Sequence, residues 1–214
     1  MRKIELAALI IVIFSFFLAF YLYPQMQETM AFHWNIEGKV DSYASKSLAL
    51  FLMPAIGFLL FLLFLAIPRI DPLKKNIEKF RNYFDSFFIL ILLFLLYLYS
   101  LTIIWNLGFT FNMVKNLVPA FSVLFFYTGV LVENAKRNWF VGIRTPWTLS
   151  SEKVWNKTHK LGGKLIKIAA FISLLGFFFE NLAFYFLILP ILFACFYSVV
   201  YSYFEFKKIR KSSQ

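Results

Sequence analysis

The sequence predicts an all-α, polytopic integral membrane protein of about six transmembrane helices, with a short interfacial helix in one connecting loop. Three observations predict this class. Of the 214 residues 61% are hydrophobic, 30 of them are Phe, and the apolar residues gather into long runs separated by basic segments. A single soluble core of this size could not hold so many aromatic side chains, whereas helix surfaces that face lipid accommodate them.

Six runs are long enough, or nearly long enough, to cross the hydrocarbon core of a bilayer, which takes roughly 17 to 25 apolar residues. The first three runs are the clearest. The fifth is the shortest and contains Lys167, and it must form a tight hairpin with the sixth around Glu180. The expected spans are residues 4–23, 47–67, 86–105, 117–132, 165–179 and 182–204.

The basic residues predict the orientation of these spans. Of the 22 Lys and Arg residues, all but Lys39, Lys46 and Lys115 fall in the two termini, in the connection after the second span, or in residues 135–167, which end just inside the fifth span. Cytoplasmic segments carry the excess of Lys and Arg in membrane proteins, so we expect a multi-pass protein of the cell membrane with both termini in the cytoplasm. The first run lacks a small-residue cleavage site before Pro24 and is interpreted as a retained anchor.

The outer loop, residues 24–46, is polar and too short to fold alone. His33 with Glu37 and Asp41 offers imidazole and carboxylate groups, the ligands of a metal site, but the chain has just two His, expected on opposite sides of the membrane. We therefore favour a loop held by its own hydrogen bonds, with no metal and no cofactor, and keep a metal site as the alternative. Gly38 is expected in a turn with positive φ. The candidate residues here are His33, Asn35, Gly38, Asp41 and Lys46.

The inner loop, residues 135–167, contains a Gly-Ile-Arg-Thr-Pro turn followed by a short amphipathic stretch. Thr148 or Ser150 is expected to cap a helix there by accepting from free backbone N–H groups, and Glu152 falls in the first turn, where the helix dipole favours an anion. Gly162-Gly163 is expected to end this helix before the fifth span. Such an element is typical of an interfacial helix at the level of the lipid headgroups.

Arg144 is the sharpest candidate in the inner loop. Pro146 restrains the turn, so the Arg144 guanidinium is expected to face a lipid phosphate or an internal carboxylate such as Glu133. Trp155 and His159, four residues apart, share one helix face, and the tryptophans of the loop are expected near the headgroups. The candidate residues of the inner loop are Trp139, Arg144, Thr145, Pro146, Trp147, Glu152, Trp155 and His159.

Both loops resemble a known family. The stretch NWFVGIRTPWTLSSEKVWNKTHKLGG, residues 138–163, closely resembles the signature of SdpI-family membrane proteins. The stretch LYPQMQETMAFHWNIEGKVDSYASK, residues 22–46, resembles the small N-terminal domain of unknown function that often precedes it. The expected organisation is an N-terminal two-helix unit, residues 1–67, and an SdpI-like four-helix unit, residues 68–214.

The resemblance implies bacteriocin immunity and signalling. The best-known member of the family protects a sporulating bacterium against its own secreted peptide toxin and, on sensing it, holds an autorepressor at the membrane. The implied partners are the lipid bilayer, a secreted hydrophobic peptide toxin and a cytoplasmic transcriptional repressor, with no direct nucleic-acid contact. Arg144, Trp147, Trp155 and His159 are the expected repressor contacts.

Other function classes are less well supported by the residues. A transporter of small solutes or lipids usually carries ionisable residues in the middle of its spans, where this chain has almost none. A membrane-embedded metal-dependent enzyme needs clustered His or acidic residues facing one cavity. We therefore expect no enzyme activity. A lipid-organising role for the inner helix, without a specific partner, is a third alternative.

Overall fold

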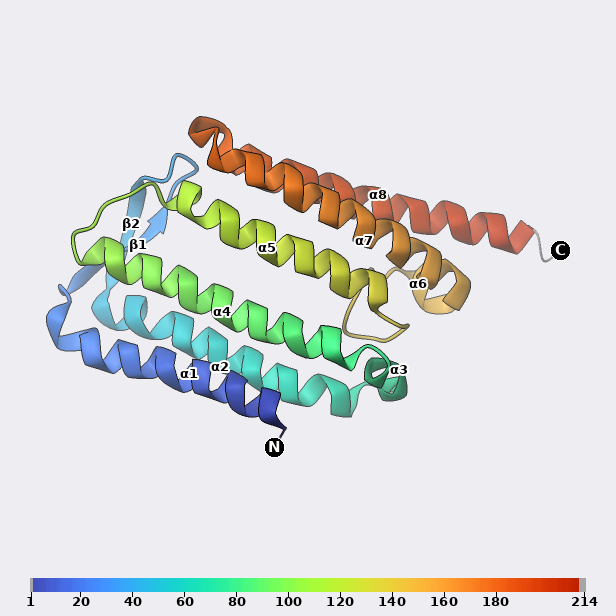
Figure 1. The fold of residues 1–214 in the computed structure, drawn as a ribbon, viewed down its shortest axis with the longest axis horizontal. Helices are drawn as coiled ribbons and strands as arrows, with labels where there is room; N and C mark the ends of the chain where they lie inside the picture. The colour runs from blue at the N-terminus through green and yellow to red at the C-terminus, as the bar shows by residue number, and fades with distance from the viewer. Residues whose placement is uncertain (1, 212–214) are drawn as a thin grey trace.

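A computed structural model describes residues 2–211 and confirms the all-α membrane class. Six long helices run side by side within the described residues, and the chain direction alternates from each to the next, so that α1 begins and α8 ends toward the same end of the bundle (Figure 1). The long helices are α1 (Lys3–Leu22), α2 (Lys46–Ile70), α4 (Arg81–Asn106), α5 (Met113–Asn134), α7 (Glu152–Leu174) and α8 (Ala183–Lys211).

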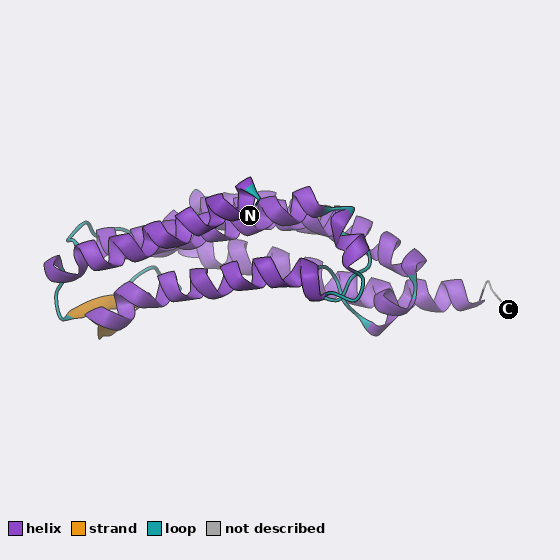
Figure 2. Ribbon diagram, turned by 90° about the horizontal axis from the view of Figure 1, so that it is seen from below, coloured by secondary structure: helices purple, strands orange, loops and turns teal. Residues whose placement is uncertain are grey.

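Short elements join the long helices at the two ends. At the end where α1 begins lie α3 (Lys74–Glu78) and α6 (Pro146–Ser150). At the other end lie a two-stranded sheet and three 3-10 turns, as Figures 1 and 2 show for the strands. These elements are η1 (Tyr23–Gln25), β1 (Thr29–Trp34), β2 (Val40–Ser45), η2 (Leu175–Phe177) and η3 (Glu180–Leu182).

Five segments within residues 2–211 are long and apolar enough to cross a membrane, namely Lys3–Gln25, Lys46–Ile70, Arg81–Asn106, Met113–Asn134 and Glu180–Lys211. Large apolar side chains are exposed on the outside of these helices, among them Phe17, Leu59 and Phe196. Apolar surface of this extent calls for lipid rather than water around the bundle.

The sixth long helix, α7, corrects the predicted limits of the fifth span. The sequence suggested a short helix that ends at Gly162-Gly163, whereas α7 is continuous from Glu152 to Leu174, 23 residues. Its N-terminal part, up to Lys164, carries four lysines, which keeps the helix outside the five apolar spans. Ser151 caps α7 by accepting from the N–H of Val154, so the prediction of Thr148 or Ser150 as its cap was wrong.

The two glycines lie within α7, at positions where neighbouring helices approach too closely for a side chain. A Cβ on Gly163 would lie 2.6 Å from the carbonyl oxygen of Gly129 in α5, and one on Gly162 would lie 2.9 Å from the hydroxyl of Ser198 in α8. Both glycines are buried. The pair therefore marks a close helix crossing within the chain, as small residues do in membrane bundles.

The outer loop folds as a β-hairpin, which the sequence analysis missed. β1 pairs antiparallel with β2, from Thr29 opposite Ser45 to Trp34 opposite Val40. Gly38 has φ of 77°, which confirms the predicted turn. Asn106, near the end of α4, receives the N–H of Ala31 at 2.8 Å and donates to the carbonyl of the same residue at 3.0 Å, so the hairpin is fastened to the bundle.

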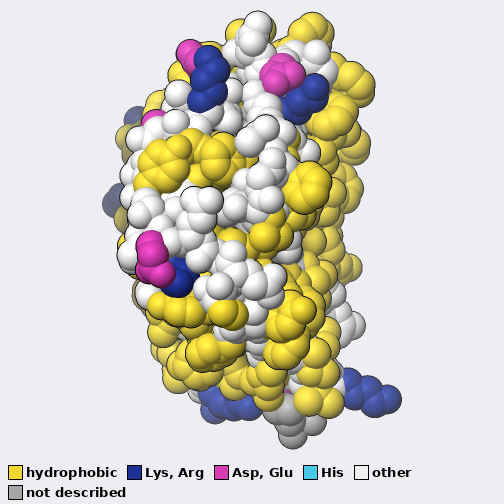
Figure 3. All heavy atoms as spheres, turned by 90° about the vertical axis from the view of Figure 1, so that its left-hand side faces the viewer, with side chains coloured by type: hydrophobic (Ala, Val, Ile, Leu, Met, Phe, Trp, Pro, Cys, Tyr) yellow, Lys and Arg dark blue, Asp and Glu magenta, His cyan; other side chains and the backbone are white. Residues whose placement is uncertain are grey.

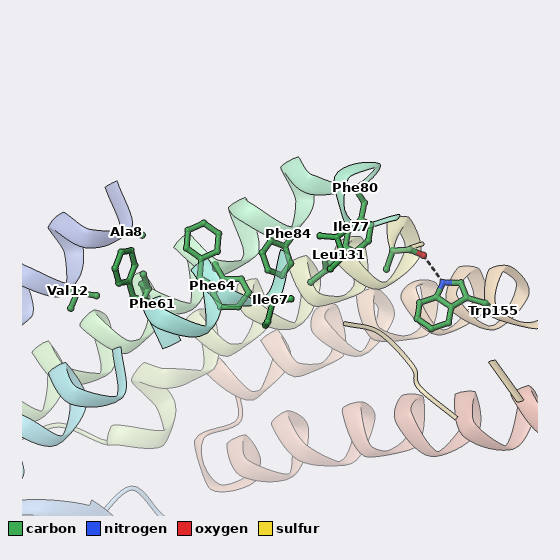
Figure 4. Packing of buried hydrophobic residues seen from close by; sticks show 13 residues of the cluster. Ala8, Val12, Phe61, Phe64, Ile67, Ile77, Phe80, Phe84, Leu131 and Trp155 are labelled. Atoms are coloured by element: carbon green, nitrogen blue, oxygen red, sulfur yellow. Dashed lines mark hydrogen bonds between the residues drawn. The ribbon is translucent and has the colours of Figure 1, made fainter. Parts of the chain in front are cut away.

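The main core lies along the inside of the bundle and is rich in aromatic rings. Phe88 stacks on Phe64, with ring centroids 5.0 Å apart, and Phe84 packs against both. Trp155 lies at one end of this core, and its indole N–H donates to the carbonyl of Ala135 at 2.8 Å (Figure 4). α4 packs against α1 and α2 as well as against α5. The expected division into an N-terminal unit, residues 1–67, and an SdpI-like unit, residues 68–214, therefore stays a prediction.

Candidate functional site at the two ends of the bundle

The inner segment, residues 135–161, is held in shape by two buried side chains that the sequence analysis did not single out. The amide oxygen of Asn138 accepts the N–H groups of Phe140 and Val141 at 2.9 and 2.7 Å. Asp71, at the end of α2, accepts the N–H of Trp139 at 2.9 Å. The sequence did offer a signal for Asp71, because this acidic residue directly precedes Pro72 and follows the second span closely.

Trp155 and His159 lie together on α7, as their spacing predicted, but face the protein interior. Their rings stack with centroids 3.8 Å apart. Trp155 has 0% of its surface exposed and His159 only 1%, so the expected place of Trp155 near the headgroups was wrong. This face of α7 packs against α5 and the inner segment instead of lipid, and in this structure neither ring is open to a partner.

The hydrogen bonds of His159 define its protonation state. Nε2 accepts the backbone N–H of Ile143 at 2.9 Å, so the proton of the neutral ring lies on Nδ1, which donates to the carbonyl of Trp155 at 2.8 Å. Burial lowers the pKa of His159 to about 4, because a charged imidazolium would lose its hydration there. His159 is therefore a neutral structural acceptor that fixes the turn around Ile143.

Arg144 is exposed and its Nη1 donates to the carbonyl of Trp139 at 2.5 Å. Glu133 does not receive it, because that carboxylate pairs with Lys167 at 2.6 Å, so the expectation of Glu133 as a partner was wrong. The Trp139 side chain is exposed beside it. Arg144 thus projects from a rigid turn with most of its five donors still available.

The turn after Arg144 is anchored to α8. Thr145 caps α6 by accepting the N–H of Thr148 at 3.2 Å, and its hydroxyl lies 3.0 Å from that of Ser202. Pro146 occupies the first turn of α6, where its missing N–H has no consequence. Trp147 packs edge-on against Tyr203 of α8, and Glu152 lies in the first turn of α7 as predicted.

Three of the outer candidate residues form charged pairs. Nδ1 of His33 lies 2.5 Å from a carboxylate oxygen of Asp41, and both side chains are exposed. Lys46 pairs with Glu28 at 2.8 Å. Figure 3, which faces this end, shows acidic and basic side chains lying next to one another. Within residues 2–211, no three His, Cys, Asp or Glu side chains are grouped closely enough to hold a metal ion.

The turn of the hairpin is fixed by two asparagines. The side-chain oxygen of Asn35 accepts the N–H groups of Glu37 and Lys39 at 3.0 and 3.1 Å. Asn112, which caps α5, donates to the carbonyl of Glu37 at 2.9 Å and lies directly against Gly38. The hairpin is therefore a rigid part of this end of the bundle rather than a free loop.

A groove of about 460 Å³ lies between the hairpin and the ends of α5 and α8 that are nearest to it. We call it the outer groove. Most of its lining is apolar, and the His33–Asp41 pair also lines it. The apolar lining comes from Trp34 and Ile36 of the hairpin segment, Val114, Leu117 and Phe121 of α5, and Phe184, Leu187 and Ile188 of α8.

Comparison with known proteins finds two family models, one for each of the two segments, and a relative that covers both. The model of the SdpI/YfhL protein family matches residues 134–202, and that of a domain of unknown function, DUF1648, matches residues 10–58. The chain is 29% identical over 211 residues to "Immunity protein SdpI" of Bacillus subtilis (strain 168), across 98% of this chain and 99% of that protein. No solved structure matches. These findings confirm the resemblance seen in the two loops.

Proposed function

We propose that this chain, a member of the SdpI family, is a membrane immunity protein that protects its cell against a membrane-active peptide toxin and retains a cytoplasmic repressor through its inner segment. The similarity to Immunity protein SdpI, which extends over 98% of the chain, carries the proposal. The two family matches include the hairpin end and the inner segment, so the relationship extends to both ends of the bundle.

The outer groove is the proposed toxin site. Its lining is supplied by two span helices and by the hairpin, so a hydrophobic peptide that arrives along the membrane could bury apolar side chains there without leaving lipid. Its volume is in the range of pockets that enclose part of a ligand. His33 and Asp41 offer hydrogen-bonding groups that would orient the peptide backbone.

The inner segment is the proposed repressor site. Arg144 and Trp139 are exposed and joined by a hydrogen bond, and Trp147 is half-exposed on α6, where it packs against Tyr203. Trp and Arg are the residues that most often dominate protein interfaces. Trp155 and His159, which are buried, would keep the turn in shape without touching the partner. The predicted orientation, with 19 of the 22 basic residues on the side of the termini, would place this segment in the cytoplasm.

Expression in a bacterium that is sensitive to a secreted hydrophobic peptide toxin tests the proposal. We expect the chain to raise survival, His33→Ala to reduce that protection, and Arg144→Ala to lower the amount of repressor recovered with the membrane fraction. Lys153→Ala removes another exposed charge from the same end of the bundle and serves as the control. No protection by wild-type chain present in the membrane would contradict the proposal, and full activity of both variants would contradict the site assignment.

A further inference from the structure

Five charged side chains meet where α1 begins, α2 ends and α4 begins. Arg2 bonds to Asp85, with Nη1 2.6 Å from Oδ2, and to Glu5, with Nε 3.0 Å from Oε1. Arg81 bonds to the same Asp85 at 2.8 Å, and Arg69 lies 3.8 Å from Glu5. We call this group the arginine cluster. None of its residues belongs to the outer groove or to the inner segment.

The charges of the arginine cluster are unequal in number and in exposure. Three guanidinium groups face two carboxylates, which leaves one positive charge in excess. The carboxylate side chains of Glu5 and Asp85 are only 6% and 10% exposed, whereas the side chains of Arg2 and Arg69 are 42% and 63% exposed. The negative charges are thus enclosed, and the excess positive charge faces outward.

The cluster also retains free hydrogen-bond donors. Arg81 reaches Asp85 through Nε, which leaves its two Nη groups for another acceptor. Arg69 makes the longest ion pair of the cluster, and one of its Nη groups donates to the carbonyl of Leu65. An open space of about 400 Å³ lies against Arg69 and Arg81, with Arg2, Glu5 and Pro68 as its other walls. A tetrahedral phosphate is small enough to enter it.

We propose that the arginine cluster binds the phosphate group of an anionic phospholipid. The cluster lies at the ends of three membrane spans, Lys3–Gln25, Lys46–Ile70 and Arg81–Asn106, which is the level of the lipid headgroups. Planar guanidinium groups match phosphate oxygens in pairs, and two of them converge on one open space here. A bound phosphate would neutralise the excess charge and join the ends of α2 and α4.

Native mass spectrometry of the full-length protein in detergent tests this proposal, with phosphatidylglycerol, phosphatidylcholine and inorganic phosphate as separate probes. We expect wild-type protein to retain one phosphatidylglycerol. Arg69→Gln should weaken that binding about tenfold, the loss expected for one charge-assisted hydrogen bond. Arg69 is the variant of choice because its exposed side chain has the weakest internal pairing, so the fold should survive its loss. Arg69→Lys, which keeps the charge but lacks the planar guanidinium group, should bind phosphatidylglycerol with intermediate affinity.

Lys75→Gln is the matched control, because Lys75 is an exposed cation of α3 at the same end of the bundle and lies outside the open space. It should bind phosphatidylglycerol as wild type does. Displacement of the lipid by inorganic phosphate at equal concentration would support the phosphate chemistry and identify free phosphate as its source. Equal losses in Arg69→Gln and Lys75→Gln, or no loss in either, would overturn the proposal.

Discussion

A Cβ atom on Gly142 would lie 2.3 Å from Nε2 of His159, closer than such atoms can approach. The same ring nitrogen accepts the N–H of Ile143, the next residue along the chain. Gly142 also has φ of 118°, a conformation that L side chains rarely adopt. The inner turn therefore depends on two features together, a glycine that leaves space and an imidazole that receives the neighbouring N–H.

Gly142→Ala should destabilise the protein more than Gly108→Ala. Both glycines have positive φ, so both changes should incur a backbone cost of about 1–3 kcal/mol. A Cβ on Gly108 would meet no atom within 4 Å, whereas the new methyl at residue 142 would displace His159 and break its bond to Ile143. Thermal unfolding in detergent measures the difference. Equal losses would show that His159 does not constrain the turn.

His159→Phe should lower stability by about 1–3 kcal/mol, because a ring of similar shape would leave the buried N–H of Ile143 without its acceptor. His33→Phe is the control, since His33 is exposed on the hairpin. The measurement is the free energy of unfolding of both variants in the same detergent. A loss in His33→Phe as large as that in His159→Phe would contradict this role.

Stability should fall on acidification through His159, which lies outside the five membrane spans. Its pKa is lowered from 6.5 to about 4 by burial, so between these values the unfolded chain binds a proton that the folded chain does not. The neutral ring's contribution is complete above about pH 6.5 and falls by about 3 kcal/mol as the pH drops to about 4. The unfolding free energies of wild type and His159→Phe, measured at pH 7, 6 and 5, should approach each other as the pH falls. Parallel pH profiles would refute the assignment.

The hydropathy runs and the distribution of Lys and Arg were enough to predict the class, because a bilayer selects apolar helix surfaces whatever their neighbours are. The limits of α7 were not predictable in this way. Gly162-Gly163 is equally the signal of a helix end and of a close helix crossing. Which of the two applies depends on how closely Gly129 of α5 approaches, and that is set by the tertiary packing of the helices.

The candidate site shows the same limit of local patterns. The spacing of Trp155 and His159 correctly placed them on one face, but periodicity does not tell whether that face meets lipid or protein. Asp71 and Asn138 were missed because their importance arises only when the inner segment folds back over the end of α2. The hairpin was missed because neither strand alternates regularly between buried and exposed residues, and because the bonds from Asn106 to Ala31 come from a distant helix.

Gly163→Ala should weaken the packing of α7 on α5. Its methyl would lie 2.6 Å from the carbonyl oxygen of Gly129, a backbone atom that can move only with its helix. Overpacking of this kind typically costs about 1–3 kcal/mol. Gly57→Ala in α2 is the control, because its nearest neighbour would be Leu92 at 3.9 Å. Size-exclusion profiles after graded heating should show earlier loss of Gly163→Ala, and equal profiles would contradict the close crossing.

Leu117→Trp should reduce protection against the peptide toxin by filling the outer groove. Leu117 lines the groove and is partly exposed, so the larger indole can occupy the space without entering the main core. Leu192→Trp on α8 introduces the same side chain at an exposed position that does not line the groove, and it controls for a general effect of added bulk on insertion. Survival is measured at equal membrane levels of each variant. Lower survival with Leu117→Trp alone is the expected result, since a groove that binds apolar residues loses its capacity once it is occupied. Full protection by Leu117→Trp would place toxin recognition elsewhere on the protein and leave the inner-segment proposal unaffected.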